Sequence, residues 1–348
     1  MKLRASLEAG WFVGFLLSVS AASAVSVWVS PNYTSNTFGG MLTVNITGLT
    51  NGETVILERR LDANWDGLSD ANDPLTLRVQ LTDGQVATIG GATNLNVPGD
   101  VNPLGGEITA RVNLYAPFLD QAVGPAHYWR VSSPTGRFAP AMGSCMFTNA
   151  PFAQRVQGVV RCSGTNVFAA MVVAVNLLAD ASIAGAAVTT TAGSYTLRLP
   201  EGVYMLVAAR PGYVTDMSTA PIIALGPGQT VTTNLDLLPA TRTISGTLVE
   251  AADTNAVLPG ILIQADSAGG LFAPAWTDAT GKFTLAVRED AWQLEPAGED
   301  LARHGCLYAE SQRERVFLTT TGNVSGVVLT AVRANALIYG KATNQTNA

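Results

Sequence analysis

An acidic stretch between residues 62 and 73 carries the residue types that bind a hard divalent cation. Oxygen-bearing side chains stand at positions 1, 3, 5, 9 and 12 of this stretch, and Gly67 stands at position 6. In a 12-residue calcium loop these oxygens converge, glycine permits the sharp bend, and position 7 offers its backbone carbonyl. The sequence therefore predicts a Ca²⁺ site with the ligands Asp62, Asn64, Asp66, Leu68 (through its carbonyl), Asp70 and Asp73.

This stretch resembles the calcium loops of EF-hand and dockerin proteins, with two departures. Asp73 stands where that pattern has Glu, which shortens the reach of a bidentate carboxylate. Pro74 follows, and the alternation after it predicts a strand, so we expect a loop between two strands and no helix-loop-helix unit. The ion would be structural, since it offsets repulsion among the carboxylates. The alternative is a solvated acidic turn, because Asp and Gly are ordinary turn residues.

Two tryptophans are candidates for ligand contact. Trp65 lies inside the acidic stretch, and Trp276 lies shortly before the turn at Gly281. An exposed indole can stack against a sugar ring while its N–H seeks a partner. Trp292 lies on an apolar strand face, so we expect it in a core.

The cysteines and histidines suggest little further chemistry. Cys145 and Cys162 could form a disulfide in an oxidising compartment, or remain two buried thiols. Cys306 is left over, and together with His304 it would need two more ligands to hold a metal.

The sequence contains none of the common catalytic signatures. It has no His-Glu-x-x-His, no Gly-x-Ser-x-Gly, no P-loop and no Gly-x-Gly-x-x-Gly. Acidic pairs such as Glu289-Asp290 are adjacent in sequence, so on a strand their side chains would face opposite ways. We therefore predict that the protein is not an enzyme.

The second half of the chain contains a repeated β pattern, so we expect strands to position the candidate residues there. Gly158 is followed 35 residues later by Gly193-Ser194-Tyr195-Thr196-Leu197, and Gly246 is followed at the same distance by Gly281-Lys282-Phe283-Thr284-Leu285. The offset between the copies is 88 residues, which indicates one repeated supersecondary unit. Met171–Val175 lies at the same offset from Pro259–Ile263, which predicts a buried strand in both copies.

The pattern resembles the carboxypeptidase regulatory-like domain. The quoted features are an apolar-x-Gly opening, a middle apolar strand, Gly-x-Tyr/Phe-x-Leu and an aromatic return strand. The resemblance implies seven-stranded β-sandwiches related to transthyretin-like and carbohydrate-binding-like folds, without catalysis. It covers about half of the chain.

The region before the repeats predicts a further β domain. Alternating segments such as Met41–Ile46, Leu75–Leu81 and Ile108–Leu114 are separated by turn signals such as Asn51-Gly52 and Asp83-Gly84. Short strands at this spacing favour an Ig-like sandwich. The predicted fold class is therefore all-β, with tandem Ig-like and transthyretin-like β-sandwiches after a signal peptide.

The first residues and the composition indicate where the protein works. Lys2 and Arg4 precede an apolar run, and Ala22-Ser23-Ala24 fits a cleavage site, which predicts a secretory signal peptide and no stable membrane span after cleavage. The net charge of −6 and the absence of a basic cluster exclude a nucleic-acid surface. The predicted units are a signal peptide (1–24), an Ig-like sandwich with the calcium-type loop (25–150), repeat 1 (155–240), repeat 2 (241–334) and the start of a truncated third repeat (335–348).

We expect a secreted, extracellular or cell-envelope protein that serves as a spacer, display or adhesion scaffold, with structural Ca²⁺ in its first module. The alternative is a set of carbohydrate-binding modules, with a glycan or another surface protein as the partner. A third interpretation makes the chain the front part of a larger surface enzyme or adhesin.

Overall fold

The computed structural model describes residues 24–114, 120–178, 182–308, 314–317 and 322–338. The predicted signal peptide up to Ser23 and the predicted third repeat from Tyr339 onward lie outside these residues. The regular secondary structure of the described residues is almost entirely β-strand, with one α-helix of six residues and one short 3-10 helix, so the all-β prediction is confirmed. Within these ranges no helix has the length and apolar character that crossing a membrane requires.

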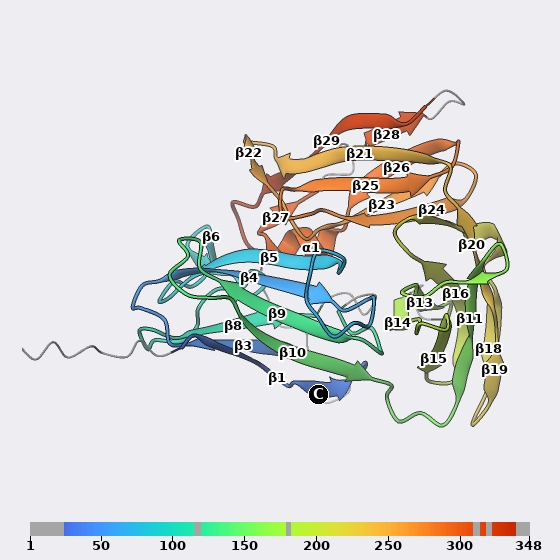
Figure 1. Cartoon of the computed structure of the whole chain (residues 1–348), viewed down its shortest axis with the longest axis horizontal. Helices are drawn as coiled ribbons and strands as arrows, with labels where there is room; N and C mark the ends of the chain where they lie inside the picture. The colour runs from blue at the N-terminus through green and yellow to red at the C-terminus, as the bar shows by residue number, and fades with distance from the viewer. Residues whose placement is uncertain (1–23, 115–119, 179–181, 309–313, 318–321, 339–348) are drawn as a thin grey trace, which may run out of the picture.

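The N-terminal module is a sandwich of two sheets (Figure 1). Its strands alternate between core and solvent, as Leu42, Val44 and Ile46 show by being fully buried in every second position of one strand. One sheet contains β1 (Ser26–Ser30), β3 (Met41–Thr47) and β8 (Ile108–Asn113). The other contains β2 (Tyr33–Ser35), β10 (Ala141–Thr148), β9 (Ala126–Ser132), β4 (Thr54–Leu61) and β5 (Leu75–Thr82); β6 (Thr88–Ile89) and β7 (Ala92–Thr93) form a separate hairpin.

Repeat 1 and repeat 2 are built from corresponding strands. In repeat 1 these are β11 (Arg155–Cys162), β12 (Thr165–Asn166), β13 (Met171–Asn176), β14 (Ser182–Val188), β15 (Ser194–Arg198), β16 (Gly202–Ala209), β17 (Tyr213–Asp216), β18 (Ile222–Leu225), β19 (Thr230–Thr232) and β20 (Leu235–Pro239), with the short 3-10 helix η1 (Met217–Thr219). In repeat 2 they are β21 (Arg242–Glu250), β22 (Asp253–Val257), β23 (Leu262–Ser267), β24 (Leu271–Trp276), β25 (Lys282–Val287), β26 (Ala291–Pro296), α1 (Gly298–Arg303), β27 (Cys306–Leu307), β28 (Glu314–Phe317) and β29 (Val324–Arg333).

The two copies use the marked residues in the same way. Tyr195 faces Gly158 across the β11–β15 pair, and Phe283 faces Gly246 across the β21–β25 pair. Both aromatic rings are buried in the core of their own repeat. A Cβ added to Gly246 would collide with the backbone carbonyl of Val327. A Cβ added to Gly158 would likewise collide with the backbone carbonyl of Thr233. Each glycine is therefore required by a close backbone approach.

The aromatic residues of the return strands are also equivalent. Tyr204 is fully buried and its hydroxyl donates to the Pro200 carbonyl at 2.9 Å. Trp292 is buried at the corresponding place, and its Nε1 donates to the Arg288 carbonyl at 2.9 Å. The expectation that Trp292 packs in a core is confirmed.

One part of the predicted alignment is wrong by three residues. β13 begins at Met171, but β23 begins at Leu262 and not at Pro259. The reason is a longer hairpin in repeat 2, where β22 has five residues and its counterpart β12 has two. The insertion lies between the opening and middle strands. The middle strands are therefore offset by 91 residues (262 − 171), whereas the opening glycines and the later turn glycines are offset by 88.

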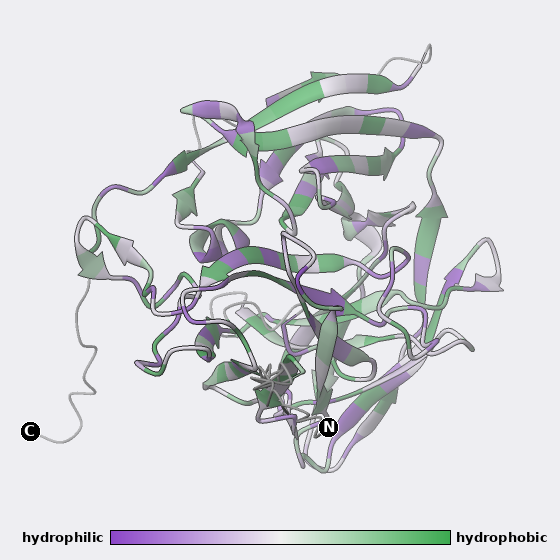
Figure 2. Cartoon of the chain, turned by 60° about the vertical axis from the view of Figure 1, so that its left-hand side comes forward, coloured by the Kyte–Doolittle hydropathy of each residue, from purple (hydrophilic) through white to green (hydrophobic). Residues whose placement is uncertain are grey.

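The three modules pack into one body (Figure 1). β17 of repeat 1 pairs with β24 of repeat 2, which joins strands of both repeats in one sheet, and Val214 of β17 packs in the core of repeat 2. Repeat 2 also reaches back to the N-terminal module, where a Cβ on Gly260 would lie 2.9 Å from the Cα of Leu77. Figure 2 shows hydrophobic and hydrophilic segments alternating along the strands of all three modules.

Candidate metal loop and module junction

The acidic stretch forms a compact loop between two paired strands, β4 and β5. The Leu61 N–H donates to the Pro74 carbonyl at 3.2 Å, which closes the base of the loop. Gly67 has φ +76°, so the glycine at position 6 makes the left-handed bend that the sequence pattern requires. Trp65 at position 4 also has a positive φ, 59°, which is strained for a bulky residue. The expected loop between strands is therefore present.

The carboxylates near the start of the loop accept hydrogen bonds from its backbone. Asp62 accepts from the N–H groups of Asp66 at 3.1 Å and Gly67 at 3.2 Å. Asp66 accepts from the Leu68 N–H at 2.8 Å. These bonds wrap the chain around Asp62, which is 5% exposed. In the described part of the chain, no three His, Cys, Asp or Glu side chains stand in an arrangement ready to hold a metal.

Asp73 at position 12 has the environment that best fits a cation. Its side chain is 2% exposed, and its Oδ1 is buried without a hydrogen-bond partner. Burial raises the pKa of Asp73 to about 6, and the charges of Asp62, Asp70 and Asp66 add to the rise. Burial likewise raises the pKa of Asp62. A buried oxygen without a hydrogen-bond partner, among like charges, is costly unless a cation offsets the charge.

Trp65 does not lie free above the loop. Its Nε1 donates to the Thr189 carbonyl of repeat 1 at 3.2 Å, and its ring is close enough to Gly124 that an added Cβ would lie 3.0 Å from it. The side chain is 37% exposed. Its indole N–H is thus engaged between modules, which weakens the interpretation of Trp65 as a ligand platform.

Trp276 lines a cleft where all three modules meet. The cleft has a volume of about 670 Å³; Asp73 and Pro74 line it from the N-terminal module, Pro211 from repeat 1, and Lys282 from repeat 2. Part of the Trp276 side chain packs against buried apolar residues, and its Nε1 is buried without a partner. Trp276 is half-buried and lines this cleft, so part of its ring borders a space that a ligand could occupy.

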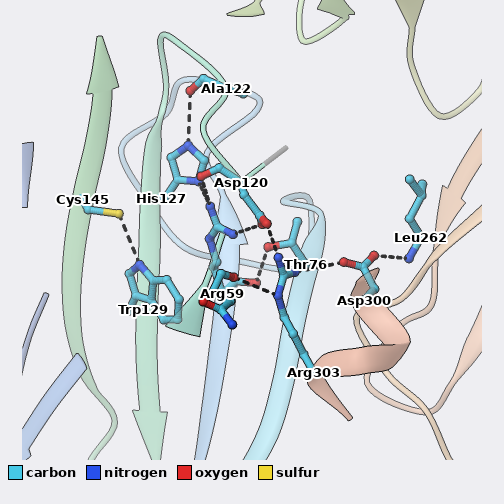
Figure 3. Close-up of polar contacts among 11 residues, drawn as sticks. Arg59, Thr76, Asp120, Ala122, His127, Trp129, Cys145, Leu262, Asp300 and Arg303 are labelled. Carbon is cyan, nitrogen blue, oxygen red and sulfur yellow. Dashed lines mark hydrogen bonds and ion pairs between the residues drawn. The ribbon is translucent and has the colours of Figure 1, made fainter. Parts of the chain in front are cut away.

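A buried ion-pair network joins repeat 2 to the N-terminal module (Figure 3). Asp120 lies between two guanidinium groups: its Oδ1 accepts from Arg59 at 2.5 Å, and its Oδ2 accepts from Arg303 of α1. Arg303 also contacts Asp300 at 3.0 Å and donates through Nε to the Asn113 carbonyl at 3.3 Å. Arg59, Asp120 and Arg303 are each at most 2% exposed, so the pairing compensates charges that burial would otherwise penalise strongly.

His127 belongs to this network as a neutral ring. Arg59 donates to its Nδ1 at 2.7 Å, so Nδ1 is the acceptor and Nε2 donates to the Ala122 carbonyl at 3.3 Å. Burial, together with the charge of Arg59, lowers the pKa of His127 to about 3. The ring therefore positions Arg59 and offers no proton-transfer group near neutral pH.

The sequence interpretation missed this network. The only local signal is Glu58-Arg59-Arg60, three charged residues in succession on β4, of which Glu58 and Arg59 are buried. Their partners lie far along the chain, and a periodic pattern carries no information about which distant charge will meet them.

The proposed disulfide between Cys145 and Cys162 is not formed, and both are free thiols. The physical reason is that the residues belong to different cores. Cys145 is buried in the N-terminal sandwich, where Trp129 Nε1 donates to its sulfur at 3.4 Å, whereas Cys162 packs against the core of repeat 1. Cys306 is buried in the core of repeat 2, and its thiol donates to the His304 carbonyl at 3.7 Å.

No protein-family model matches the chain, and no curated protein matches it. Among solved structures, the Bacillus anthracis TIE protein is 13% identical with a TM-score of 0.24, over 91% of this chain and 59% of that one. The Lactobacillus rhamnosus GG shaft pilin SpaA is 14% identical with a TM-score of 0.24, over 53% and 99% of the two chains. A streptococcal ancillary pilin is 12% identical with a TM-score of 0.25, over 89% and 99%. Likenesses this distant carry no argument about activity or partners, and the carboxypeptidase regulatory-like resemblance stays a prediction.

Proposed function

We propose that this chain is a non-catalytic scaffold of the cell exterior or envelope, in which three β-sandwiches form one rigid body for display or adhesion. The observation that supports it is the use made of the charged and titratable core residues. The buried network holds repeat 2 against the N-terminal module and consists of Arg59, Asp120, His127 and Arg303. In an active site such groups would instead surround a substrate. Because these buried charges hold the modules together, the chain is suited to keeping its modules in a fixed arrangement.

Secretion is the part of this proposal that is simplest to test. Cells expressing the full chain should carry it in the medium or envelope fraction, and replacement of residues 1–24 by a single Met should retain it inside. Recovery of the unaltered chain in the cytoplasm alone would contradict the proposal.

The proposal includes a structural Ca²⁺ in the acidic loop, held by Asp62, Asn64, Asp66, the Leu68 carbonyl, Asp70 and Asp73. Bound there, the ion would supply positive charge to the buried oxygen of Asp73 and neutralise repulsion within the loop. The loop carboxylates would exchange some of their present backbone hydrogen bonds for coordination. Extracellular fluid with millimolar Ca²⁺ would keep such a site filled.

An isosteric substitution separates this site from a solvated acidic turn. Asp73→Asn removes a buried negative charge, so we expect the calcium-free protein to melt at an equal or higher temperature than wild type. The same variant should lose the rise in melting temperature that millimolar Ca²⁺ gives the wild type. Calorimetric titration and thermal unfolding measure both effects, with Asp253→Asn at the exposed start of β22 in repeat 2 as the matched control. A wild-type protein indifferent to millimolar Ca²⁺ would remove the site.

A second candidate function, glycan binding, is favoured by the cleft beside Trp276. The cleft combines an indole with carboxylate, amide and ammonium groups, which is the mixture that polar ring-shaped ligands use. A glycan array should give a saturable signal that Trp276→Phe weakens and Trp276→Ala abolishes. Trp28→Ala is the control, because Trp28 is an exposed tryptophan on β1 outside the residues that line the cleft. This candidate function would be wrong if the array gave no signal, or if Trp28→Ala reduced the signal as much as Trp276→Ala.

A further inference from the structure

We propose that Ca²⁺ in the acidic loop controls how firmly repeat 1 docks on the N-terminal module. This inference rests on the calcium site proposed above and adds a consequence outside the module that binds the ion. The loop lies where the modules meet: Leu61, the residue before it, belongs to a buried apolar cluster shared by all three. The cluster contains Leu61, Ala122, Met171, Val173, Ala186 and Val188, with Trp276 packed against it.

Trp65 is the contact that connects the loop to repeat 1. Its Nε1 donates to the Thr189 carbonyl, and Thr189 is a fully buried residue that organises repeat 1. The Thr189 hydroxyl accepts from the Ala170 N–H at 2.9 Å and donates to the Val167 carbonyl at 2.8 Å. Thr277 does the same for repeat 2, so the contact is made to a structural element common to both repeats.

A second connection runs through the backbone close to Trp65. The Val123 N–H donates to the Ala186 carbonyl at 2.9 Å, and the Val188 N–H donates to the Val123 carbonyl at 3.0 Å. Val123 thus forms a parallel bridge to β14, next to Gly124, against which the Trp65 ring lies. One indole therefore supports both the side-chain and the backbone contacts between the two modules.

The loop backbone determines where that indole points. Trp65 has φ 59° and stands between Asn64 and Asp66, two of the expected ligands. A left-handed conformation is strained for a bulky residue and persists only when its surroundings enforce it. Coordination of both neighbours would fix this conformation, whereas repulsion among the uncoordinated carboxylates opposes it. Loss of the ion would then release Trp65 from Thr189 and weaken the Val123 bridge.

Hydrogen exchange of the full chain, followed by mass spectrometry, tests this inference at the amides concerned. With millimolar Ca²⁺ in place of a chelator, peptides that contain Val123 and Val188 should exchange at least about threefold more slowly. Peptides of β18 on repeat 1 should not change, and neither should those of α1, because the Arg303–Asp120 pair docks repeat 2 without the loop. Terbium luminescence, measured on the same samples, reports occupancy of the loop independently.

Two variants separate docking from binding. Trp65→Ala should keep terbium binding but lose most of the calcium-dependent protection at Val188, while Trp65→Phe should keep an intermediate share because its ring still covers Gly124. If terbium and Ca²⁺ bind while Val123 and Val188 exchange at unchanged rates, this inference is wrong and the calcium site stands. If neither ion binds, the calcium site itself fails. Protection that persists undiminished in Trp65→Ala would also overturn the inference.

Discussion

At the scale of single residues, the buried charges have unequal partners. Asp120 is held by two guanidinium groups, whereas Asp300 has Arg303 on one oxygen and the Leu262 N–H on the other, at 2.9 Å. Burial raises the pKa of Asp300 to about 7, against the pull of Arg303, and the nearby charges of Asp120 and Glu299 add to the rise. Between about pH 4 and pH 7, Asp300 is therefore protonated in a larger fraction of folded than of unfolded molecules.

The raised pKa of Asp300 predicts the direction in which stability changes with pH. The folded state binds a proton at Asp300 that the unfolded state has lost, so stability falls as pH rises from about 4 to 7 and is level above it, by at most about 1.4 kcal/mol per pH unit. Asp300→Asn removes that dependence. The stability of wild type relative to Asp300→Asn, from urea unfolding, should therefore decline between pH 5 and pH 7. Glu289→Gln, an exposed residue that is not among the charges acting on Asp300, should leave the decline intact. A constant difference across this range would contradict the assignment.

At the scale of elements, the repeated glycines mark positions where backbone meets backbone. On β21, which pairs with β29 in parallel, a Cβ added to Gly246 would collide with the Val327 carbonyl and with the buried ring of Phe283. An added methyl group has no flexible neighbour to displace. The strand pairing, and with it the core of repeat 2, must shift to admit it.

Gly246→Ala should destabilise the protein by about 3 kcal/mol or more, because both strands are buried backbone. Gly322→Ala is the matched control: nothing lies within 4 Å of its added Cβ, so the free energy of unfolding should change by about 0.5 kcal/mol or less. Denaturant unfolding measures both. Equal stability of the two variants would show that β21 and β29 do not approach as described.

The sequence predicts these elements well because their signals are local. Alternation, Gly193 and Gly281 at the turns, and the recurrence of Tyr195 and Phe283 all depend on residues within one repeat. The three-residue shift of β23 was hidden by the hairpin insertion before it. The Arg59–Asp120–Arg303 network and the docking of Trp65 on Thr189 could not be read, because they depend on how whole modules pack. The loop pattern identified oxygen donors, but Asp73 emerges as the critical one only from its burial.

At the scale of the molecule, the modules do not form an extended string. The β17–β24 pairing joins the two repeats, the Arg303–Asp120 pair returns repeat 2 to the N-terminal module, and the cluster around Leu61 joins all three. A spacer gains length from modules that avoid each other. This arrangement instead holds the three modules in one fixed arrangement, as the proposed scaffold requires.

Small-angle X-ray scattering of the full chain in millimolar Ca²⁺ tests this central claim most directly. A single compact body of this length should have a radius of gyration of about 20 Å. Three sandwiches strung end to end would give about 30 Å or more, since each alone measures about 13 Å. A value near the first figure supports one rigid body fastened at the loop and at Arg303; a value near the second contradicts it.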